Sequence, residues 1–131
     1  MDILTIAAIV ILLAIGFNFY TKKTAKKSIG KEIDFNQLPA DFANKIKNKF
    51  LILFFTSDSC SNCKIQERLF DEMEGIRNHL LYIDTKSDHE LVNYFGIKGT
   101  PTLITVKNNK IIDNLVGVQN KTVLERYLDE N

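Results

Sequence analysis

The chain has 131 residues, which is enough for one domain together with a short tail or anchor. A hydrophobic fraction of 45% and a charged fraction of 25% are typical of globular proteins and exclude disorder along the whole length. Four of the 17 basic residues lie close together, at Lys22, Lys23, Lys26 and Lys27, and only one of the 16 acidic residues, Asp2, precedes them. The rest of the chain has 13 basic and 15 acidic residues. That balance argues against a nucleic-acid-binding surface on the folded part.

An uncharged, strongly apolar run occupies residues 3–20 near the N-terminus. As a helix, 18 residues come close to crossing the roughly 30 Å hydrocarbon core of a bilayer. A cleaved signal peptide would have basic residues before the run and small residues after it, but the run follows Asp2 and ends in Phe19 and Tyr20. A core helix is rarely apolar on every face. We therefore predict an uncleaved transmembrane anchor over residues 1–21.

The four lysines lie in a short polar segment, residues 22–30, which we predict to be a basic tether ahead of a domain over residues 31–131. The tether either lies along an anionic lipid surface or only supplies flanking charge. The positive-inside rule favours a single-pass protein whose domain is cytoplasmic. An extracytoplasmic domain is the alternative, because disulfides persist outside the cytoplasm.

The domain begins with a possible edge strand at residues 31–35 and a helix at residues 40–46. Six successive apolar residues, 50–55, predict a strand that is covered on both faces. After a loop with Ser59 as N-cap, a helix is expected to start at Cys60. The stripe expected to face the core comprises Ile65, Leu69, Met73 and Ile76.

A second buried strand is predicted at residues 80–83, followed by a short helix that Gly96 ends. Strands at residues 102–106 and 111–116 are joined by a hairpin in which Asn108 and Asn109 tolerate positive φ. A last helix begins at Asn120 or Lys121. This order predicts a three-layer α/β sandwich with a mixed central sheet, preceded by the one transmembrane helix.

Cys60 and Cys63 are the only cysteines, and they lie between the predicted strand 50–55 and the following helix. The loop that they would close is too short to stabilise a fold, so their role is chemical rather than structural. A helix N-terminus also favours a thiolate at Cys60. The pair is therefore a candidate redox centre.

Several further features follow in order after these cysteines: Ile83-Asp84 at the end of a strand, Gly96-Ile97-Lys98-Gly99-Thr100-Pro101-Thr102, the Asn-containing hairpin, and Gly117. With Cys60-Ser61-Asn62-Cys63-Lys64, they make residues 31–131 resemble the thioredoxin family. The resemblance implies a thioredoxin-like fold, and a cis Pro101 beside the cysteines with the backbone of Thr100 available to pair with a substrate strand. It implies no cofactor.

The chain departs from the family pattern at four places. Ser59 replaces the usual Trp before the first cysteine, and Ser61-Asn62 replace Gly-Pro between the cysteines. Phe54 aligns with the family's buried acid, and Arg68 aligns with the proline that kinks the motif helix. Without that acid, the proton of Cys63 must pass to water or to the substrate.

The sequence thus predicts a membrane-anchored thiol-disulfide oxidoreductase that exchanges disulfides with protein substrates and with an unidentified redox partner. Cys60 would attack and Cys63 would resolve the mixed disulfide. One alternative is a peptide-binding adaptor of the same fold, for which redox chemistry is incidental. Another is zinc binding by the two cysteines with His79 and His89, but these histidines are ten positions apart on different predicted elements, so no metal site is expected.

Overall fold

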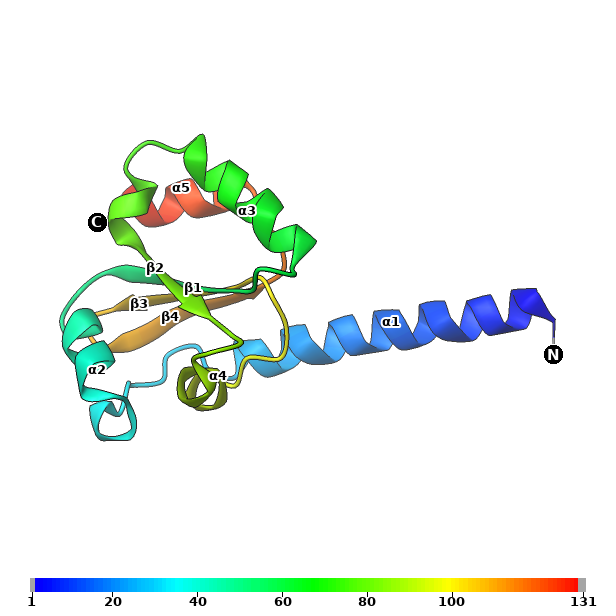
Figure 1. Cartoon of the computed structure of the whole chain (residues 1–131), viewed down its shortest axis with the longest axis horizontal. Coiled ribbons are helices and arrows are strands. Elements are labelled where there is room, and N and C mark those ends of the chain that lie inside the picture. Colours follow the sequence, from blue (N-terminus) through cyan, green and yellow to red (C-terminus); the bar gives the residue numbers. More distant parts are fainter. Residues whose placement is uncertain (1, 130–131) are drawn as a thin grey trace.

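The computed structural model describes residues 2–129. One long N-terminal helix projects from a domain in which helices cover both faces of a sheet (Figure 1). The elements in chain order are α1 (Ile3–Lys26), η1 (Phe35–Gln37), α2 (Ala40–Ile46), β1 (Leu51–Thr56), α3 (Ser61–Asp71), η2 (Ile76–His79), β2 (Leu80–Asp84), α4 (His89–Phe95), β3 (Thr102–Lys107), β4 (Lys110–Val116) and α5 (Lys121–Asp129).

The sheet has the order β2-β1-β3-β4. β1 runs parallel to β2 and antiparallel to β3, and β3 and β4 form an antiparallel hairpin, so the sheet is mixed. Helices α3 and α5 lie on one face, and α2 and α4 lie on the other (Figure 1). The predicted three-layer α/β sandwich is confirmed.

β1 lies inside the sheet and is covered on both faces, as its apolar run predicts. Ile52, Leu53, Phe54 and Phe55 each have 0% of their surface exposed. Since side chains alternate along a strand, Leu53 and Phe55 pack towards α2 and α4, whereas Ile52 and Phe54 pack towards α3 and α5. One strand therefore joins the two halves of the core and ends beside the cysteines.

Two strand predictions were wrong. Residues 31–35 do not form a strand, because their only ladder contact is an isolated bridge between Glu32 and Lys110. β2 is an edge strand rather than a buried one, and only Ile83 on it is buried. A run of four apolar residues indicated burial on both faces, but β2 has no neighbouring strand on its outer side.

The buried stripe of α3 also differs from the predicted one. Its buried residues are Cys63, Gln66 and Phe70, whereas Ile65 is 41% exposed. The helix ends at Asp71, so the buried Met73 and Ile76 lie beyond it. The prediction missed the buried face because it followed hydrophobicity, which places a glutamine on the solvent side, whereas Gln66 is buried.

α1 is the helix, among residues 2–129, that is long and apolar enough to cross a membrane. Its most apolar 18-residue window has a mean hydropathy of 2.4, and the domain covers none of it. The helix continues past the apolar run through Lys26 and contacts β4.

The segment expected to be a tether, residues 22–30, is held against the domain. Thr21 is only 6% exposed, and the side-chain amide of Asn114 on β4 donates a 2.8 Å hydrogen bond to Ser28 Oγ. The backbone N–H of Gly30 donates to the carbonyl of Ile111 (2.7 Å), and the N–H of Ile111 donates to the carbonyl of Lys31 (3.0 Å). These contacts hold the segment against β4, so it is not a free tether.

Candidate active site

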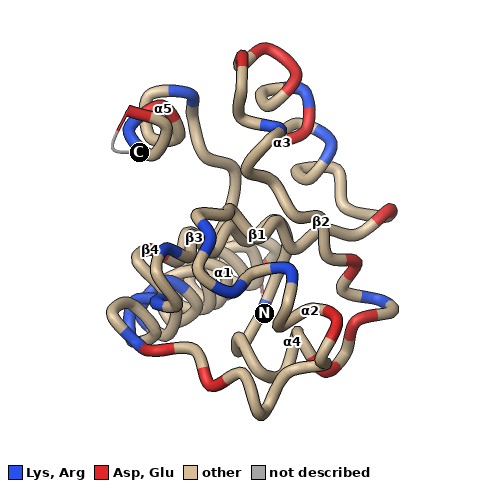
Figure 2. Tube along the Cα trace, turned by 90° about the vertical axis from the view of Figure 1, so that its left-hand side faces the viewer, with Lys and Arg blue, Asp and Glu red and all other residues tan. Residues whose placement is uncertain are grey.

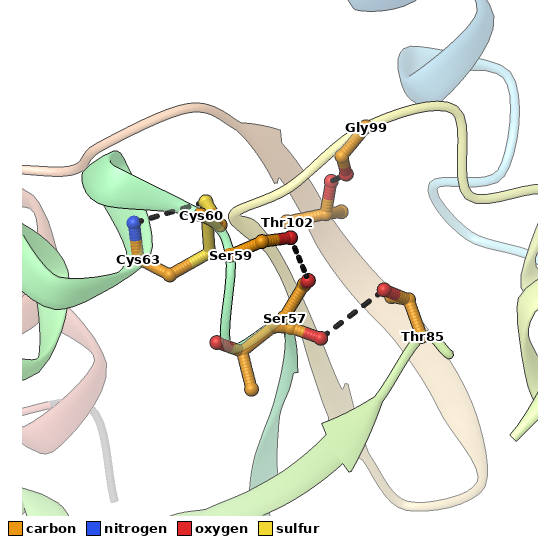
Figure 3. The surroundings of a disulfide bond; sticks show 8 residues. Ser57, Ser59, Cys60, Cys63, Thr85, Gly99 and Thr102 are labelled. Atoms are coloured by element: carbon orange, nitrogen blue, oxygen red, sulfur yellow. Dashed lines mark hydrogen bonds between the residues drawn. A yellow bond between two sulfur atoms is a disulfide. The ribbon is translucent and has the colours of Figure 1, made fainter. Parts of the chain in front are cut away.

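The two cysteines lie at the start of α3, just beyond the end of β1, and form a disulfide with a Cα–Cα distance of 5.2 Å (Figure 3). The helix begins at Ser61, and Cys60 rather than Ser59 is its N-cap. The backbone N–H of Cys63 donates to Cys60 Sγ at 3.1 Å, so a sulfur atom accepts a bond that an oxygen usually accepts at a helix start. Cys63 is 1% exposed, whereas Cys60 is half-buried.

Short-range hydrogen bonds shape the loop that carries Cys60. The N–H of Cys60 donates to the carbonyl of Ser57 (3.1 Å), and the hydroxyls of Ser57 and Ser59 are 3.1 Å apart. At the base of the loop, the N–H of Thr85 donates to the carbonyl of Thr56 at 3.0 Å. The hydroxyl of Thr85 donates to the same carbonyl at 3.2 Å (Figure 3). The loop that carries Cys60 is thus hydrogen-bonded at its base to the residue that follows β2.

A surface ion pair lies next to this loop. Lys86 pairs with Asp58, two residues before Cys60. The hydrogen bond from Lys86 and its positive charge hold the pKa of the Asp58 carboxyl below its ordinary value of 3.8. Lys86 therefore offsets the negative charge of Asp58 in the loop that carries Cys60.

Thr100 and Pro101 lie at the same end of the sheet as the cysteines. Phe55 on β1 pairs with Thr102 on the antiparallel strand β3, so Pro101, one residue before Thr102, lies level with the last residue of β1, where the cysteine loop begins. The Thr100–Pro101 peptide bond is cis, in agreement with the implication of the family resemblance. The hydroxyl of Thr102 donates to the carbonyl of Gly99 at 2.7 Å, beside the disulfide (Figure 3).

Gln66 was missed by the sequence reasoning. It is fully buried; its Oε1 accepts the N–H of Gln119 (2.7 Å), and its Nε2 donates to the carbonyl of Gln119 (3.3 Å). In the same loop, the N–H of Gly117 donates to the carbonyl of Pro101 at 2.8 Å. Gln66 thereby connects the cysteine helix to the loop that supports Pro101. No sequence pattern marks a partner 53 positions away.

The interior behind Cys63 is apolar. Phe54 belongs to the same buried cluster, with its ring centroid 5.2 Å from that of Phe70 and 5.3 Å from that of Tyr82. Among the described residues, the buried polar side chains are those of threonine, glutamine and asparagine, and none is a carboxylate. The structure thus offers Cys63 no buried acid at the Phe54 position.

The histidines of the zinc alternative do not join the cysteines. His79 packs against Phe50, with ring centroids 5.1 Å apart, before the start of β2. Because β1 and β2 are parallel, this is the end of the sheet opposite the cysteine loop. His89 starts α4 on the other face. In residues 2–129, no group of three or more His, Cys, Asp or Glu could hold a metal ion.

The sequence profile described as "Thioredoxin" matches residues 34–130. The chain belongs to the thioredoxin family. Among known members, it is 31% identical over 81 residues to Thioredoxin H5 of Oryza sativa subsp. japonica, a match that covers 60% of each chain. It is 33% identical over 81 residues to Thioredoxin 2 of Plasmodium berghei, with 58% of this chain and 52% of that protein covered. The chain thus spans about half to three fifths of these two thioredoxins.

Solved thioredoxin structures share the fold. The malaria parasite thioredoxin-2, described as a component of the protein secretion machinery, superposes with a TM-score of 0.58 at 22% identity, over 66% of this chain and 86% of that one. The thioredoxin of Fasciola hepatica superposes with a TM-score of 0.59 at 15% identity, over 70% and 90%. At these identities the likeness supports the thioredoxin fold and nothing finer.

Proposed function

We propose that this thioredoxin-family chain is a thiol-disulfide oxidoreductase that acts on protein substrates through Cys60 and Cys63. The observation that carries the proposal is the unequal exposure of the two sulfurs at a helix start. Cys60 is accessible, and its sulfur accepts an N–H of the first helical turn, whereas Cys63 is 1% exposed. Such a donor stabilises a thiolate, which is the attacking species in disulfide exchange.

In the reducing direction, the Cys60 thiolate attacks one sulfur of a substrate disulfide. An S–S bond forms between Cys60 and the substrate, and the other substrate sulfur leaves as a thiolate. Cys63 then loses its proton and attacks Cys60, which forms the Cys60–Cys63 disulfide and releases the second substrate thiolate. The substrate gains two electrons and, on protonation, becomes a dithiol, while the chain becomes the disulfide seen in the structure.

Thr100 and Pro101 are proposed to bind the substrate segment around the attacked sulfur. Their position at the end of β1, beside the cysteine loop, supports this role. Because Phe54 supplies no proton acceptor, the proton of Cys63 passes to water or to the departing substrate thiolate.

α1 is proposed to anchor the protein as a single membrane span. Its length, hydropathy and lack of cover by the domain support an anchor. The lysines after it favour a cytoplasmic domain. Protease treatment of intact cells tests the side: a protected domain agrees with the charge rule, and a digested domain supports the extracytoplasmic alternative.

The two cysteine variants test the chemistry. Cys60→Ser is expected to abolish exchange, and Cys63→Ser is expected to accumulate mixed disulfides that dithiothreitol releases. If Cys63→Ser traps nothing while Cys60→Ser retains turnover, the assigned roles are wrong. If a double Cys→Ser variant still binds its partners and the wild type shows no exchange, the adaptor alternative holds instead.

A further inference from the structure

The membrane span and the domain meet without a gap. The uncharged run ends at Tyr20, and the next residue, Thr21, is already buried. α1 contacts β4, and just beyond the end of the helix the side-chain amide of Asn114 on β4 donates a hydrogen bond to Ser28 Oγ. At 1.5 Å of rise per residue, the domain starts within one helical turn of the end of the apolar run.

The domain also has no freedom to swing away after α1. The chain between Gly30 and Ile33 is hydrogen-bonded to the β4 hairpin, because Gly30 pairs with Ile111 and the N–H of Ile33 donates to the carbonyl of Asn109 at 2.9 Å. With both α1 and this segment fixed on β4, the direction of the span sets the orientation of the domain. Figure 2, which looks nearly along α1, shows the basic end of the helix beside β4.

The redox site lies on the side of the domain from which α1 projects. A cavity of about 450 Å³ is lined by Phe19 and Lys22 of α1 and, across it, by Val116 and Gln119. The N–H of Gln119 donates a hydrogen bond to Gln66 of the cysteine helix. Two residues earlier, the N–H of Gly117 donates to the carbonyl of Pro101. In Figure 1 the N-terminal end of α3 points to the same side as α1. The loop after β4 therefore contacts the redox site through Gln66 and Pro101, and it faces the lysine-rich end of the span across the cavity.

From this arrangement we propose that the redox site works at the membrane surface, on disulfides or dithiols in juxtamembrane segments of other membrane-embedded proteins. The proposal rests on the proposed function and on α1 as a membrane span. A juxtamembrane sulfur is already at the height of Cys60 and confined to the same surface, which raises its effective concentration. A sulfur far from the membrane gains no such advantage from a domain that cannot swing outward.

The exchange itself is the two-electron step described above, and pre-reduced protein is its only reductant in a single turnover. The protein is placed in vesicles with model transmembrane peptides that carry one disulfide loop. In the near peptide the loop follows the span directly, and in the far peptide an 18-residue helical spacer raises it by about 27 Å. We expect the near peptide to be reduced at least about tenfold faster than the far one.

A raised variant tests whether height is the cause. Eighteen helix-forming residues inserted between Tyr20 and Thr21 add five whole turns, so the hydrogen bond of Ser28 to β4 is kept while the domain is lifted by about 27 Å. This variant should lose the preference for the near peptide and prefer the far one. The matched control carries the same insertion after Asp2, on the other side of the span, and should behave as the wild type.

A soluble disulfide peptide serves as the common reference, and all three proteins should reduce it within about twofold of one another, since the insertions leave the redox loop intact. Equal rates on near and far peptides in the wild type would overturn the inference while leaving the proposed function in place. An unchanged near preference in the raised variant would overturn it as well. Failure of the wild type on all three peptides would overturn the proposed function and the inference with it.

Discussion

Gln66 and Gln119 form a pair in which one buried side-chain amide satisfies both backbone groups of the other residue. The two hydrogen bonds, of 2.7 and 3.3 Å, join the cysteine helix to the loop after β4. That loop in turn binds the carbonyl of Pro101 through Gly117. The spacing between the cysteines and Pro101 thus depends on a residue that takes no part in the chemistry.

Replacement of Gln66 by leucine keeps the volume but leaves the N–H and the carbonyl of Gln119 without these partners. Because an unsatisfied buried polar group costs about 1–3 kcal/mol, we expect the free energy of unfolding to fall by about 2–4 kcal/mol. Urea unfolding in detergent micelles measures the change. Gln119→Ala is the matched control, since it keeps both backbone groups and loses only the hydrogen bonds from Gln119 Nε2 to the carbonyls of Val116 and Gly117, and it should cost about 1 kcal/mol. Equal losses in both variants would contradict this role of Gln66.

Phe54 occupies the position at which the family places a buried acid, and Phe54→Asp restores a carboxylate in the cluster that contains Cys63. We expect mixed-disulfide resolution at neutral pH to become at least about tenfold faster, because the carboxylate accepts the proton of Cys63. The lost aromatic ring should cost about 3–5 kcal/mol of stability. Quenched-flow analysis of the mixed disulfide measures the rate.

Phe54→Asn is the control for Phe54→Asp, because asparagine has the same shape and cannot accept the proton. Both variants lose the aromatic ring, and Phe54→Asp has the additional cost of burying a carboxylate, so the rates of resolution are compared between folded samples of the two. Identical rates in the two folded variants would show that a proton acceptor at residue 54 has no effect.

The pair of Asp58 and Lys86 should tune the reactivity of Cys60. Lys86 lowers the pKa of Asp58. The stabilising attraction between the two charges is therefore present above the ordinary pKa of the carboxyl and is lost as the pH falls through the lowered pKa. The pKa of Lys86 is raised, so the same contribution persists through neutral pH and is lost only in the alkaline range. At neutral pH, Lys86→Met leaves the charge of Asp58 unopposed near Cys60.

We expect alkylation of reduced Cys60 by iodoacetamide to slow about two- to threefold in Lys86→Met, since exposed charges interact weakly. The effect should fade at high salt. Asp58→Asn in the same protein should restore the rate, because it removes the unopposed charge. A slow double variant would indicate that Lys86 acts by another route.

Tyr127 on α5 donates a hydrogen bond to the Asp113 carboxylate on β4. Burial, together with this bond, raises the pKa of Tyr127 above its ordinary value of 10.0. A raised folded-state pKa contributes stability that is complete below pH 10.0 and is lost as the pH rises, because only the unfolded chain then releases the proton. Stability should therefore fall in the alkaline range.

Tyr127→Phe should remove part of that alkaline fall and cost about 1 kcal/mol at neutral pH. Urea unfolding as a function of pH measures both. Tyr82→Phe, at a 43% exposed tyrosine, is the control and should follow the wild type. If stability depends on pH in Tyr127→Phe as it does in the wild type, Tyr127 does not cause the alkaline loss of stability.

Local patterns predicted the elements whose stability is local. The apolar run at β1, the positive φ of Asn108 and Asn109, and the left-handed Gly96 were all readable from the sequence, and the structure confirms them. The buried face of α3 was not readable, because Gln66 is buried through bonds to a residue 53 positions away. The attachment of residues 22–30 to β4 escaped for the same reason, since it depends on tertiary partners.

The site shows the same division. The cysteines and the Thr100-Pro101 motif lie at one end of the sheet, because the cysteines follow the end of β1 and the motif precedes the start of the antiparallel strand β3. Cys60 rather than Ser59 is the N-cap because of the geometry of the loop, in which the N–H of Cys60 donates a hydrogen bond to the carbonyl of Ser57. Residue type alone favours serine at that position.

The packing of α1 on β4 has a consequence for synthesis. The first helix to leave the ribosome finds its partner strand only after residue 116 has been made, so most of the chain must be translated before Ser28 can meet Asn114. The hairpin of β3 and β4 is then the step at which the anchor and the domain become one folding unit. A protein cut between α1 and residue 31 would expose the surface of Leu115 and Val116, and its released domain should aggregate more readily than the intact chain.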